Sequence, residues 1–327
     1  MSAGERGFPR GPHGHVVQIE DLRHLYGQRE ALAGVTLAVG QGEILGLLGP
    51  NGGGKTTMFK ILSTLLPATG GTVRIFDHDI RREAHHVRSH LGVVFQHPSL
   101  DPKLTAMENL LHHGHLYGLS GAALKARAQA LLSRLGLGDR ARDRVETLSG
   151  GLQRRTELAK ALVHGPDLLL LDEPSTGLDP GARRDFSHYL AQLRDQDDVT
   201  VVLTTHILDE AERCDRVGIL HQGKLVALGS PDELKGKLGG DVVVIQPKDP
   251  EALRERIRDR FGCQPVLVDG GLRLERPRGH EFVHELVDAF PGEVKSVTYG
   301  KPTLEDVFVH LTGRRLWGEE ANGGRIA

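Results

Sequence analysis

One segment, Gly49 to Thr57, restricts the possible folds of this chain more than any other. It has the sequence Gly-Pro-Asn-Gly-Gly-Gly-Lys-Thr-Thr and matches the pattern G-x-x-x-x-G-K-[ST]. An apolar run with strand character, Ile44–Leu48, precedes it, and a helical stretch follows to about Leu66. Glycines let backbone N–H groups converge on a phosphate, and the N-terminus of the following helix attracts an anion. The segment therefore predicts a nucleotide site within a parallel α/β domain.

The side chains of this loop have separate predicted roles. Lys55 is expected to reach the β- and γ-phosphates, and the Thr56 hydroxyl is expected to bind Mg²⁺. A glycine-rich turn without a ligand is the alternative interpretation, and the flanking strand and helix disfavour it. The predicted nucleotide-binding loop consists of Gly49, Pro50, Asn51, Gly52, Gly53, Gly54, Lys55, Thr56 and Thr57.

Composition excludes several classes of function. Lys and Arg number 41 against 43 Asp and Glu, giving a net charge of -2, so binding of nucleic acid through bulk charge is not expected. The two cysteines are far apart, which excludes a disulfide framework and fits a reducing compartment. No apolar run approaches the roughly 20 residues that a transmembrane helix needs. Any membrane role therefore requires a partner.

The order of apolar runs predicts two domains. Residues 15–235 alternate short β-branched or Leu-rich runs with helical stretches, as expected of a mostly parallel α/β domain. Residues 236–313 follow the order strand, helix, two strands, helix, strand, which is typical of a small ferredoxin-like α+β domain. Residues 1–14 are expected to form a disordered tail, and residues 314–327 a second tail.

Polar side chains follow three further predicted strands. Gln96 follows Gly92–Phe95, Asp172 and Glu173 follow a run of four leucines, and His206 follows a Thr/Val-rich run. Ligands of doubly wound sheets bind at the carboxyl ends of the strands, so these residues should face the phosphate loop. Singly, each could be a solvated turn residue, a buried histidine or an ordinary strand exit.

Their joint position favours a catalytic interpretation. We expect Asp172 to hold a metal ion, Glu173 to polarise the attacking water, and Gln96 to bridge Mg²⁺ and that water. We expect His206 to contact the γ-phosphate and to orient the base.

A second anion site is predicted before the helical stretch 152–164. Ser149 is a good N-cap, and Gly150 and Gly151 would let a phosphate approach the backbone N–H groups. A helix cap with closely packed glycines is the alternative. A spare phosphate-binding helix suggests that it serves the nucleotide of a second subunit.

Together these motifs resemble those of the ATP-binding cassette (ABC) family, over roughly residues 15–231. The resemblance makes Gly49–Thr57 the Walker A loop, residues 168–173 the Walker B strand and Gln96 the Q-loop glutamine. It likewise makes residues 148–151 the signature, residues 175–179, ending in Asp179, the D-loop, and His206 the switch histidine. Tyr26 lies where the family places an aromatic ring on adenine, although a core tyrosine is the alternative.

The family resemblance implies a fold and a mechanism. The fold is a P-loop cassette with a mostly parallel core sheet, an antiparallel β subdomain and a helical subdomain, followed here by the small α+β domain. The mechanism is ATP hydrolysis in a head-to-tail homodimer, with Ser149, Gly150 and Gly151 contacting the nucleotide of the other subunit. Binding of ATP with Mg²⁺ closes this dimer, and hydrolysis through Glu173 reopens it.

Two positions depart from the family pattern. Leu152 stands where the signature commonly ends in Gln, with Gln153 following, and this leaves the fine contacts of the dimer interface open. Gly53 replaces the commoner Ala, which adds flexibility without removing a phosphate donor.

The segment Lys301–Phe308, followed by Leu-Thr-Gly at 311–313, is similar to the end of ATPase subunits from ABC-2-type, daunorubicin-resistance-like bacterial exporters. The resemblance implies export of a drug, antibiotic or lipid-like cargo through a separate membrane permease, with this chain on the cytoplasmic face of the cell membrane. A non-transport ABC ATPase acting on ribosomes or DNA is the alternative; it typically carries two cassettes or a long coiled-coil insertion. An importer subunit is the third hypothesis.

Eight of the eighteen histidines lie between His78 and His115. His86 and His90 are spaced to share a helix face and offer two metal ligands, but no cysteine is nearby to complete a site. We expect a polar surface instead. A further hypothesis is that this surface takes up protons near pH 6.

Overall fold

The computed structural model describes residues 14–316, so the two tails expected at residues 1–14 and 314–327 lie almost entirely outside the described residues. Contacts divide the chain into two units, Met1–Leu225 and Val226–Ala327. Across residues 14–316, no helix combines the length and the apolar character that crossing a bilayer requires.

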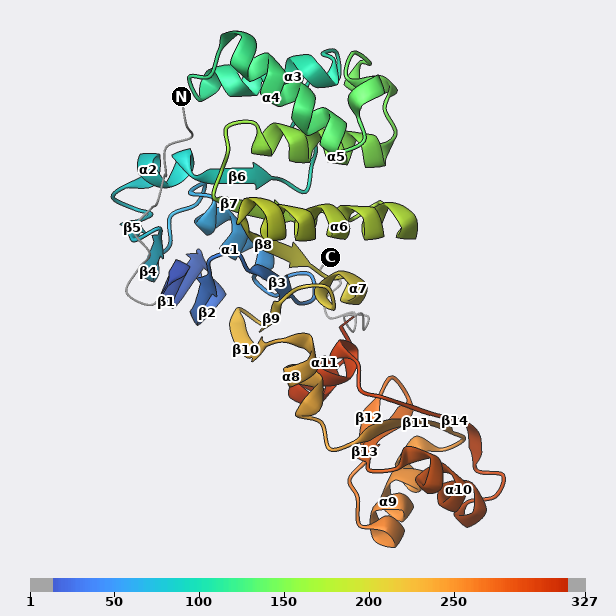
Figure 1. The fold of residues 1–327 in the computed structure, drawn as a ribbon. Helices are drawn as coiled ribbons and strands as arrows, with labels where there is room; N and C mark the ends of the chain where they lie inside the picture. The colour runs from blue at the N-terminus through green and yellow to red at the C-terminus, as the bar shows by residue number, and fades with distance from the viewer. Residues whose placement is uncertain (1–13, 317–327) are drawn as a thin grey trace, which may run out of the picture. The chain divides into compact units, whose positions relative to one another are not determined.

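Two sheets build the first unit (Figure 1). The larger has the order β10-β9-β3-β8-β7-β6, in which β3 pairs in parallel with β8 and β9, and β7 with β8 and β6. The smaller has the order β2-β1-β4-β5 and is antiparallel. The strands are β1 (His15–Tyr26), β2 (Arg29–Gly40), β3 (Ile44–Leu48), β4 (Gly70–Ile75), β5 (His78–Asp79), β6 (Leu91–Val94), β7 (Leu168–Asp172), β8 (Thr200–Thr205), β9 (Arg216–His221) and β10 (Lys224–Gly229).

The central strands of the larger sheet explain the continuous apolar runs of the sequence. Every residue of β3, β7 and β8 is buried. Parallel strands are covered on both faces, so they lack the alternation of polar and apolar residues that a half-exposed strand shows. The expected parallel core sheet and antiparallel subdomain are confirmed.

Helices complete the first unit, and three of them, α3, α4 and α5, pack on one another as the expected helical subdomain (Figure 1). Helix α1 ends at Leu62, earlier than the sequence suggested, because Thr64 adopts a left-handed backbone with φ 61°. The helices are α1 (Lys55–Leu62), α2 (Ala84–Ser89), α3 (Ala106–Leu116), α4 (Gly121–Arg134), α5 (Gly150–Leu162), α6 (Pro180–Asp197) and α7 (Leu208–Ala211).

The second unit has the predicted ferredoxin-like topology. Its four strands form an antiparallel sheet of order β12-β13-β11-β14, so the chain order is β-α-β-β-α-β as expected. Two further helices, α8 and α11, contact each other. The elements are α8 (Pro231–Gly236), β11 (Asp241–Pro247), α9 (Pro250–Phe261), β12 (Val266–Val268), β13 (Gly271–Arg276), α10 (Gly279–Ala289), β14 (Val294–Gly300) and α11 (Leu304–Thr312).

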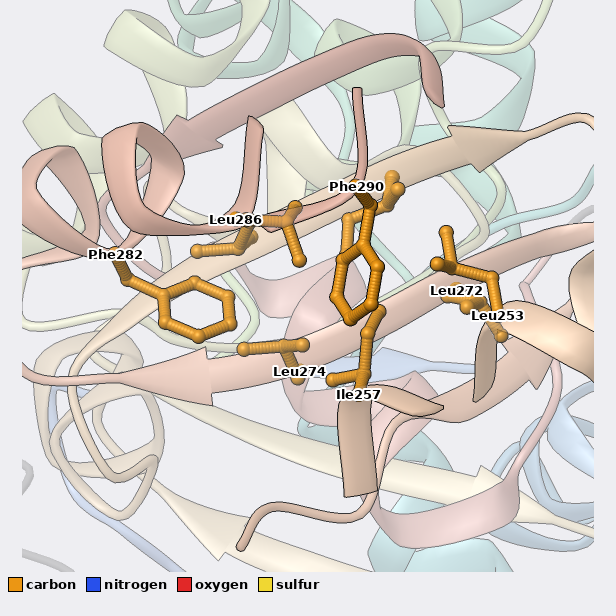
Figure 2. Packing of buried hydrophobic residues seen from close by; sticks show 9 residues of the cluster. Leu253, Ile257, Leu272, Leu274, Phe282, Leu286 and Phe290 are labelled. Atoms are coloured by element: carbon orange, nitrogen blue, oxygen red, sulfur yellow. The ribbon is translucent and has the colours of Figure 1, made fainter. Parts of the chain in front are cut away.

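The second unit has an apolar core cluster. It lies between the sheet and helices α9 and α10, where side chains from all three converge (Figure 2). Its buried members are Val243, Ile245, Leu253, Ile257, Leu272, Leu274, Phe282, Leu286 and Phe290. The spacing of Leu253 and Ile257 by four residues, and likewise of Phe282 and Leu286, places each pair on one helix face.

The segment Lys301–Phe308, which carries the exporter resemblance, has a structural role in this unit. Thr303 and Asp306 form a capping box at the start of α11. Lys301 Nζ donates to Asp241 Oδ1 at 2.8 Å. Phe308 is 1% exposed. The motif therefore starts, anchors and buries helix α11.

Candidate active site

Strand register brings the predicted site residues to one edge of the larger sheet. Leu48 of β3 pairs with Thr205 of β8, and Asp172 of β7 pairs with Thr204 of β8. Val94 of β6 pairs with Leu171 of β7. Because these strands are parallel, the residues that follow them lie at the same carboxyl edge. The phosphate loop, Gln96, Glu173 and His206 are thus neighbours although the sequence separates them widely.

The phosphate loop has the geometry that its glycines predict. Gly54 has φ 108°, and a Cβ atom there would lie 2.9 Å from the carbonyl oxygen of Ala31. Only glycine fits this position without a shift of the surrounding backbone. Lys55 Nζ donates to the carbonyl oxygens of Gly49 at 2.8 Å and Pro50 at 3.1 Å. Burial lowers the pKa of Lys55, and the nearby Glu173 carboxylate opposes that shift.

Glu173 is the centre of the site. Its Oε1 lies 3.1 Å from His206 Nδ1 and 3.7 Å from Lys55 Nζ. Its Oε2 accepts hydrogen bonds from Gln96 Nε2 at 3.3 Å and from Thr176 Oγ1 at 3.4 Å. Glu173 is only 8% exposed. Three side chains predicted from separate segments therefore meet on one carboxylate.

The backbone of Glu173 is strained. Its φ of 45° is in the left-handed region, which costs about 1–3 kcal/mol for a residue with a side chain. Its N–H donates to the carbonyl oxygen and the hydroxyl of Thr204, at 3.1 and 3.0 Å. This left-handed conformation turns the chain at the end of β7. The Glu173 side chain then lies beside Lys55 of the phosphate loop.

The residues predicted to bind magnesium offer oxygen donors of the right type. Asp172 is 4% exposed, and its Oδ1 accepts a hydrogen bond from Thr204 Oγ1 at 2.5 Å. Burial raises the pKa of Asp172, and the bond from Thr204 opposes that shift. The Thr56 hydroxyl and the Gln96 amide supply neutral oxygens. Carboxylate, hydroxyl and amide oxygens suit Mg²⁺, so the donor set fits the ion.

Tyr26 lines the same pocket as the phosphate loop. The pocket has a volume of about 190 Å³. Tyr26 is 48% exposed and its ring contacts that of His24 edge-on, so it is no core tyrosine. Arg29 and Ala31 also line the pocket, and sequence reasoning missed both. Arg29 follows Tyr26 across a short turn, and this closeness in sequence was the one feature that could have indicated a position in the pocket.

The signature residues lie apart from this pocket. Ser149 caps α5 by accepting a hydrogen bond from the N–H of Leu152 at 3.4 Å, and α5 begins directly at Gly150. Among the described residues, those lining the pocket do not include Ser149, Gly150 or Gly151. The signature residues therefore do not contribute to the nucleotide pocket of their own chain.

The departure at Leu152 has a local physical basis. Its side chain packs on an apolar cluster of Leu100, Val145 and Leu148. The amide of Gln153 donates to the carbonyl oxygens of Val145 and Leu148, at 3.1 and 3.0 Å. Both side chains therefore stabilise the loop that leads into the signature.

Asp179, the predicted D-loop residue, caps helix α6. Its Oδ1 accepts from the N–H groups of Gly181 and Ala182, at 2.9 and 3.0 Å, and these bonds lower the pKa of Asp179. Pro180 occupies the first position of the helix, where its missing N–H is harmless. The cap fixes the end of the loop that begins two residues after Glu173.

The histidine-rich stretch is only partly the polar surface that the sequence suggested. His90 Nδ1 lies 2.7 Å from Asp167 Oδ2. The described residues contain no group of three or more potential metal ligands of the His, Cys, Asp or Glu type. His113 packs near Tyr117 and His164, and burial lowers the pKa of His113 to about 4. Burial therefore disfavours proton uptake near pH 6 at His113, and uptake by the rest of this surface stays a prediction.

Comparison with known proteins supports the motifs. Residues 32–176 match the family model described as "ABC transporter". The linearmycin resistance ATP-binding protein of Bacillus subtilis (strain 168) is 36% identical, over 92% of this chain and 99% of that protein. The daunorubicin/doxorubicin resistance ATP-binding protein of Streptomyces peucetius is 39% identical, over 91% of this chain and 92% of that protein. The Nod factor export ATP-binding protein I of Paraburkholderia xenovorans (strain LB400) is 38% identical, over 92% of this chain and 98% of that protein.

Solved structures are similar to about two thirds of the chain. A dimeric ATP-binding cassette in a post-hydrolysis state, bound to ADP and Pi, has a TM-score of 0.60 and 30% identity, covering 65% of this chain and 98% of that one. An ATP-binding subunit of an ABC transporter has a TM-score of 0.61 and 30% identity, covering 68% and 92%.

Proposed function

This chain belongs to the ABC transporter family of ATP-hydrolysing subunits, and we propose that it powers an exporter through a separate membrane permease. The observation that supports the catalytic part is the convergence of Lys55, Gln96 and His206 on Glu173 at the edge of the sheet. A buried carboxylate held by a cation, an amide and an imidazole is suited to taking a proton from water.

ATP is the substrate, and the residues that line the pocket support a position for its base and its phosphates. Tyr26 stacks on adenine, and the residues from Gly49 to Thr57 surround the phosphates. Lys55 exchanges the loop carbonyls of Gly49 and Pro50 for β- and γ-phosphate oxygens. Thr56, Gln96 and Asp172 would hold Mg²⁺, and the ion would neutralise charge on the phosphates.

Hydrolysis follows from the position of Glu173. Its carboxylate accepts a proton from water as the water oxygen attacks the γ-phosphorus, and the bond to the β-phosphate oxygen breaks. ADP and phosphate leave. His206 keeps the Glu173 side chain directed at the water, and the Gln96 amide, which contacts the same carboxylate, orients that water.

The active unit is a head-to-tail homodimer. Ser149, Gly150 and Gly151 contact the ATP of the other subunit, and Asp179 lies at the interface. Two observations support this arrangement: the signature helix is capped and separate from the pocket, and a matching cassette is itself dimeric. One chain therefore supplies half of each of two sites.

Export is supported by the relatives and by the helical subdomain. The matched relatives are named for resistance to linearmycin and daunorubicin and for Nod factor export. The end of helix α3 exposes Leu116, at 82%, beside Tyr117. This apolar tip contacts the permease on the cytoplasmic face of the membrane, and the cargo is a drug, antibiotic or lipid-like molecule.

Co-purification tests this proposal. The full chain is expressed from its native operon, captured from detergent-solubilised membranes with ATP and Mg²⁺, and its partners are identified. We expect a polytopic membrane protein in stoichiometric amount, lost in a Leu116→Asp variant. Recovery of ribosomes or DNA in its place would favour the non-transport alternative.

A further inference from the structure

A buried charged cluster beside the site is not used by the mechanism above. It consists of Arg154 and Glu157 on α5, which are 8% and 1% exposed. Arg154 Nη1 donates to Glu157 Oε2 at 2.8 Å. Removing two charges from water costs several kcal/mol per ion, so such a pair persists only where its geometry and hydrogen bonds are good. The hydrogen bonds of Arg154 identify the backbone segments that this pair fixes in place.

Arg154 and Glu157 form hydrogen bonds with both ends of the segment that carries Gln96. Arg154 Nη1 donates to the carbonyl oxygen of Phe95 at 2.6 Å, directly before Gln96. Glu157 Oε1 accepts from the N–H of Ser99 at 2.5 Å and from its hydroxyl at 3.1 Å, directly after the loop. The amide that reaches Glu173 is thus tethered at both sides to one helix.

Arg154 also forms hydrogen bonds with the residues on both sides of Glu173. Its Nη2 donates to the carbonyl oxygen of Asp172 at 3.2 Å, and its Nε donates to that of Pro174 at 2.7 Å. The residue between them has the left-handed φ of 45°. A strained conformation is retained only where the surrounding structure determines it on several sides. The guanidinium supplies two of those restraints, in addition to Thr204.

The helix that carries this guanidinium is the signature helix. Arg154 lies on α5, five residues after its N-cap Ser149. We infer that Arg154, held by Glu157, is a positioning residue that fixes the backbone of Glu173 and Gln96 to the signature helix. Binding of this helix to the ATP of the other subunit therefore sets the geometry for hydrolysis of the ATP bound by its own subunit. The inference rests on the proposed dimer.

The planar fork of arginine is essential to this role, because it presents donors in several fixed directions at once. Lysine keeps the charge but has a single nitrogen that cannot reach all of these carbonyls. Arg154→Lys is therefore the informative variant. Misplacement of Glu173 by a fraction of an ångström to one ångström lowers kcat about 10- to 100-fold. The KM for ATP changes less than about 2-fold, because Arg154 does not line the nucleotide pocket.

Arg74→Lys is the matched control. The Arg74 guanidinium also donates to a backbone carbonyl, that of Asp77, at 2.7 and 3.1 Å, but it lies in the antiparallel subdomain. Its kcat and KM should equal those of the wild type. If Arg154→Lys fails to fold by thermal melting, Glu157→Gln replaces it; that variant keeps an acceptor for the Ser99 N–H and should lower kcat about 3- to 10-fold.

A double-mutant cycle with Glu173→Gln separates positioning of the base from a general loss of structure. In single-turnover hydrolysis, Arg154→Lys should lower the rate about 10- to 100-fold in the wild-type background. It should lower the rate at most about 3-fold in the Glu173→Gln background, because the two residues act together. Equal losses in both backgrounds, or an unchanged kcat in a folded variant, would overturn the inference. Normal turnover in Glu173→Gln alone would instead refute the proposed base.

Discussion

The edge of the larger sheet and the core of the second unit are both buried, yet they are built from opposite kinds of side chain. At the sheet edge, Lys55, Asp172 and Glu173 are each less than a tenth exposed. In the second unit the buried cluster contains aliphatic and aromatic residues alone (Figure 2). Burying charge opposes folding, whereas burying apolar surface drives it. Changes at the first region should therefore alter reaction rate, and changes at the second should alter stability.

Glu173→Gln should have the largest effect and should act on rate alone. Loss of the proton acceptor lowers ATPase turnover about 10²- to 10⁴-fold. ATP binding is retained, because the amide keeps the shape of the side chain, and the ATP-bound dimer accumulates. Turnover by phosphate release and dimer formation by size-exclusion chromatography with ATP measure both effects. Lys55→Ala is the contrasting variant: it loses ATP binding itself, since its Nζ is the cation of the loop.

Phe290→Ala should act on stability alone. Phe290 is 3% exposed in the apolar cluster, and its truncation lowers the free energy of unfolding of the second unit by about 3–5 kcal/mol. Urea unfolding measures the loss. Val287→Ala, on helix α10 directly before Phe290, is the control, because Val287 is 47% exposed and its truncation changes the free energy by about 0.5 kcal/mol or less. Equal effects of the two would contradict the assigned core.

Glu210→Gln should have the smallest effect and should change how stability depends on pH, because Glu210 is a titratable carboxyl group that is only 6% exposed. Burial raises its pKa from 4.5 to about 7, against opposing effects of Thr205, Ser175 and Arg154. Between pH 4.5 and 7 the folded protein holds this proton while the unfolded chain has lost it, so stability falls as pH rises through that window.

The neutral amide removes this dependence. The variant should be more stable than the wild type by up to about 3 kcal/mol at pH 8, because each pKa unit corresponds to roughly 1.4 kcal/mol, and nearly equal to it near pH 4.5. Thermal unfolding at the two pH values tests the difference. A variant that is destabilised at pH 8 would show instead that the ionised carboxylate is favourable there.

Much of this molecule follows from local sequence. The strand Ile44–Leu48 and the chain order of the second unit could be predicted because burial on both strand faces and the four-residue helical spacing leave visible patterns. The ends of elements were less accessible. Helix α1 ends early because Thr64 has a left-handed backbone. A glycine at that position would have predicted this conformation, but a threonine does not.

Local pattern was also enough to identify the residues available for chemistry at the ends of strands, because a phosphate loop and the carboxylates after a leucine run are recognisable within a few residues. It could not show that Arg154 holds both sides of Glu173, or that His113 is buried near His164. These contacts join segments far apart in the chain and became visible only in the folded structure. Strand register and helix packing set the partners of a buried polar group, and neither is encoded in a short stretch of sequence.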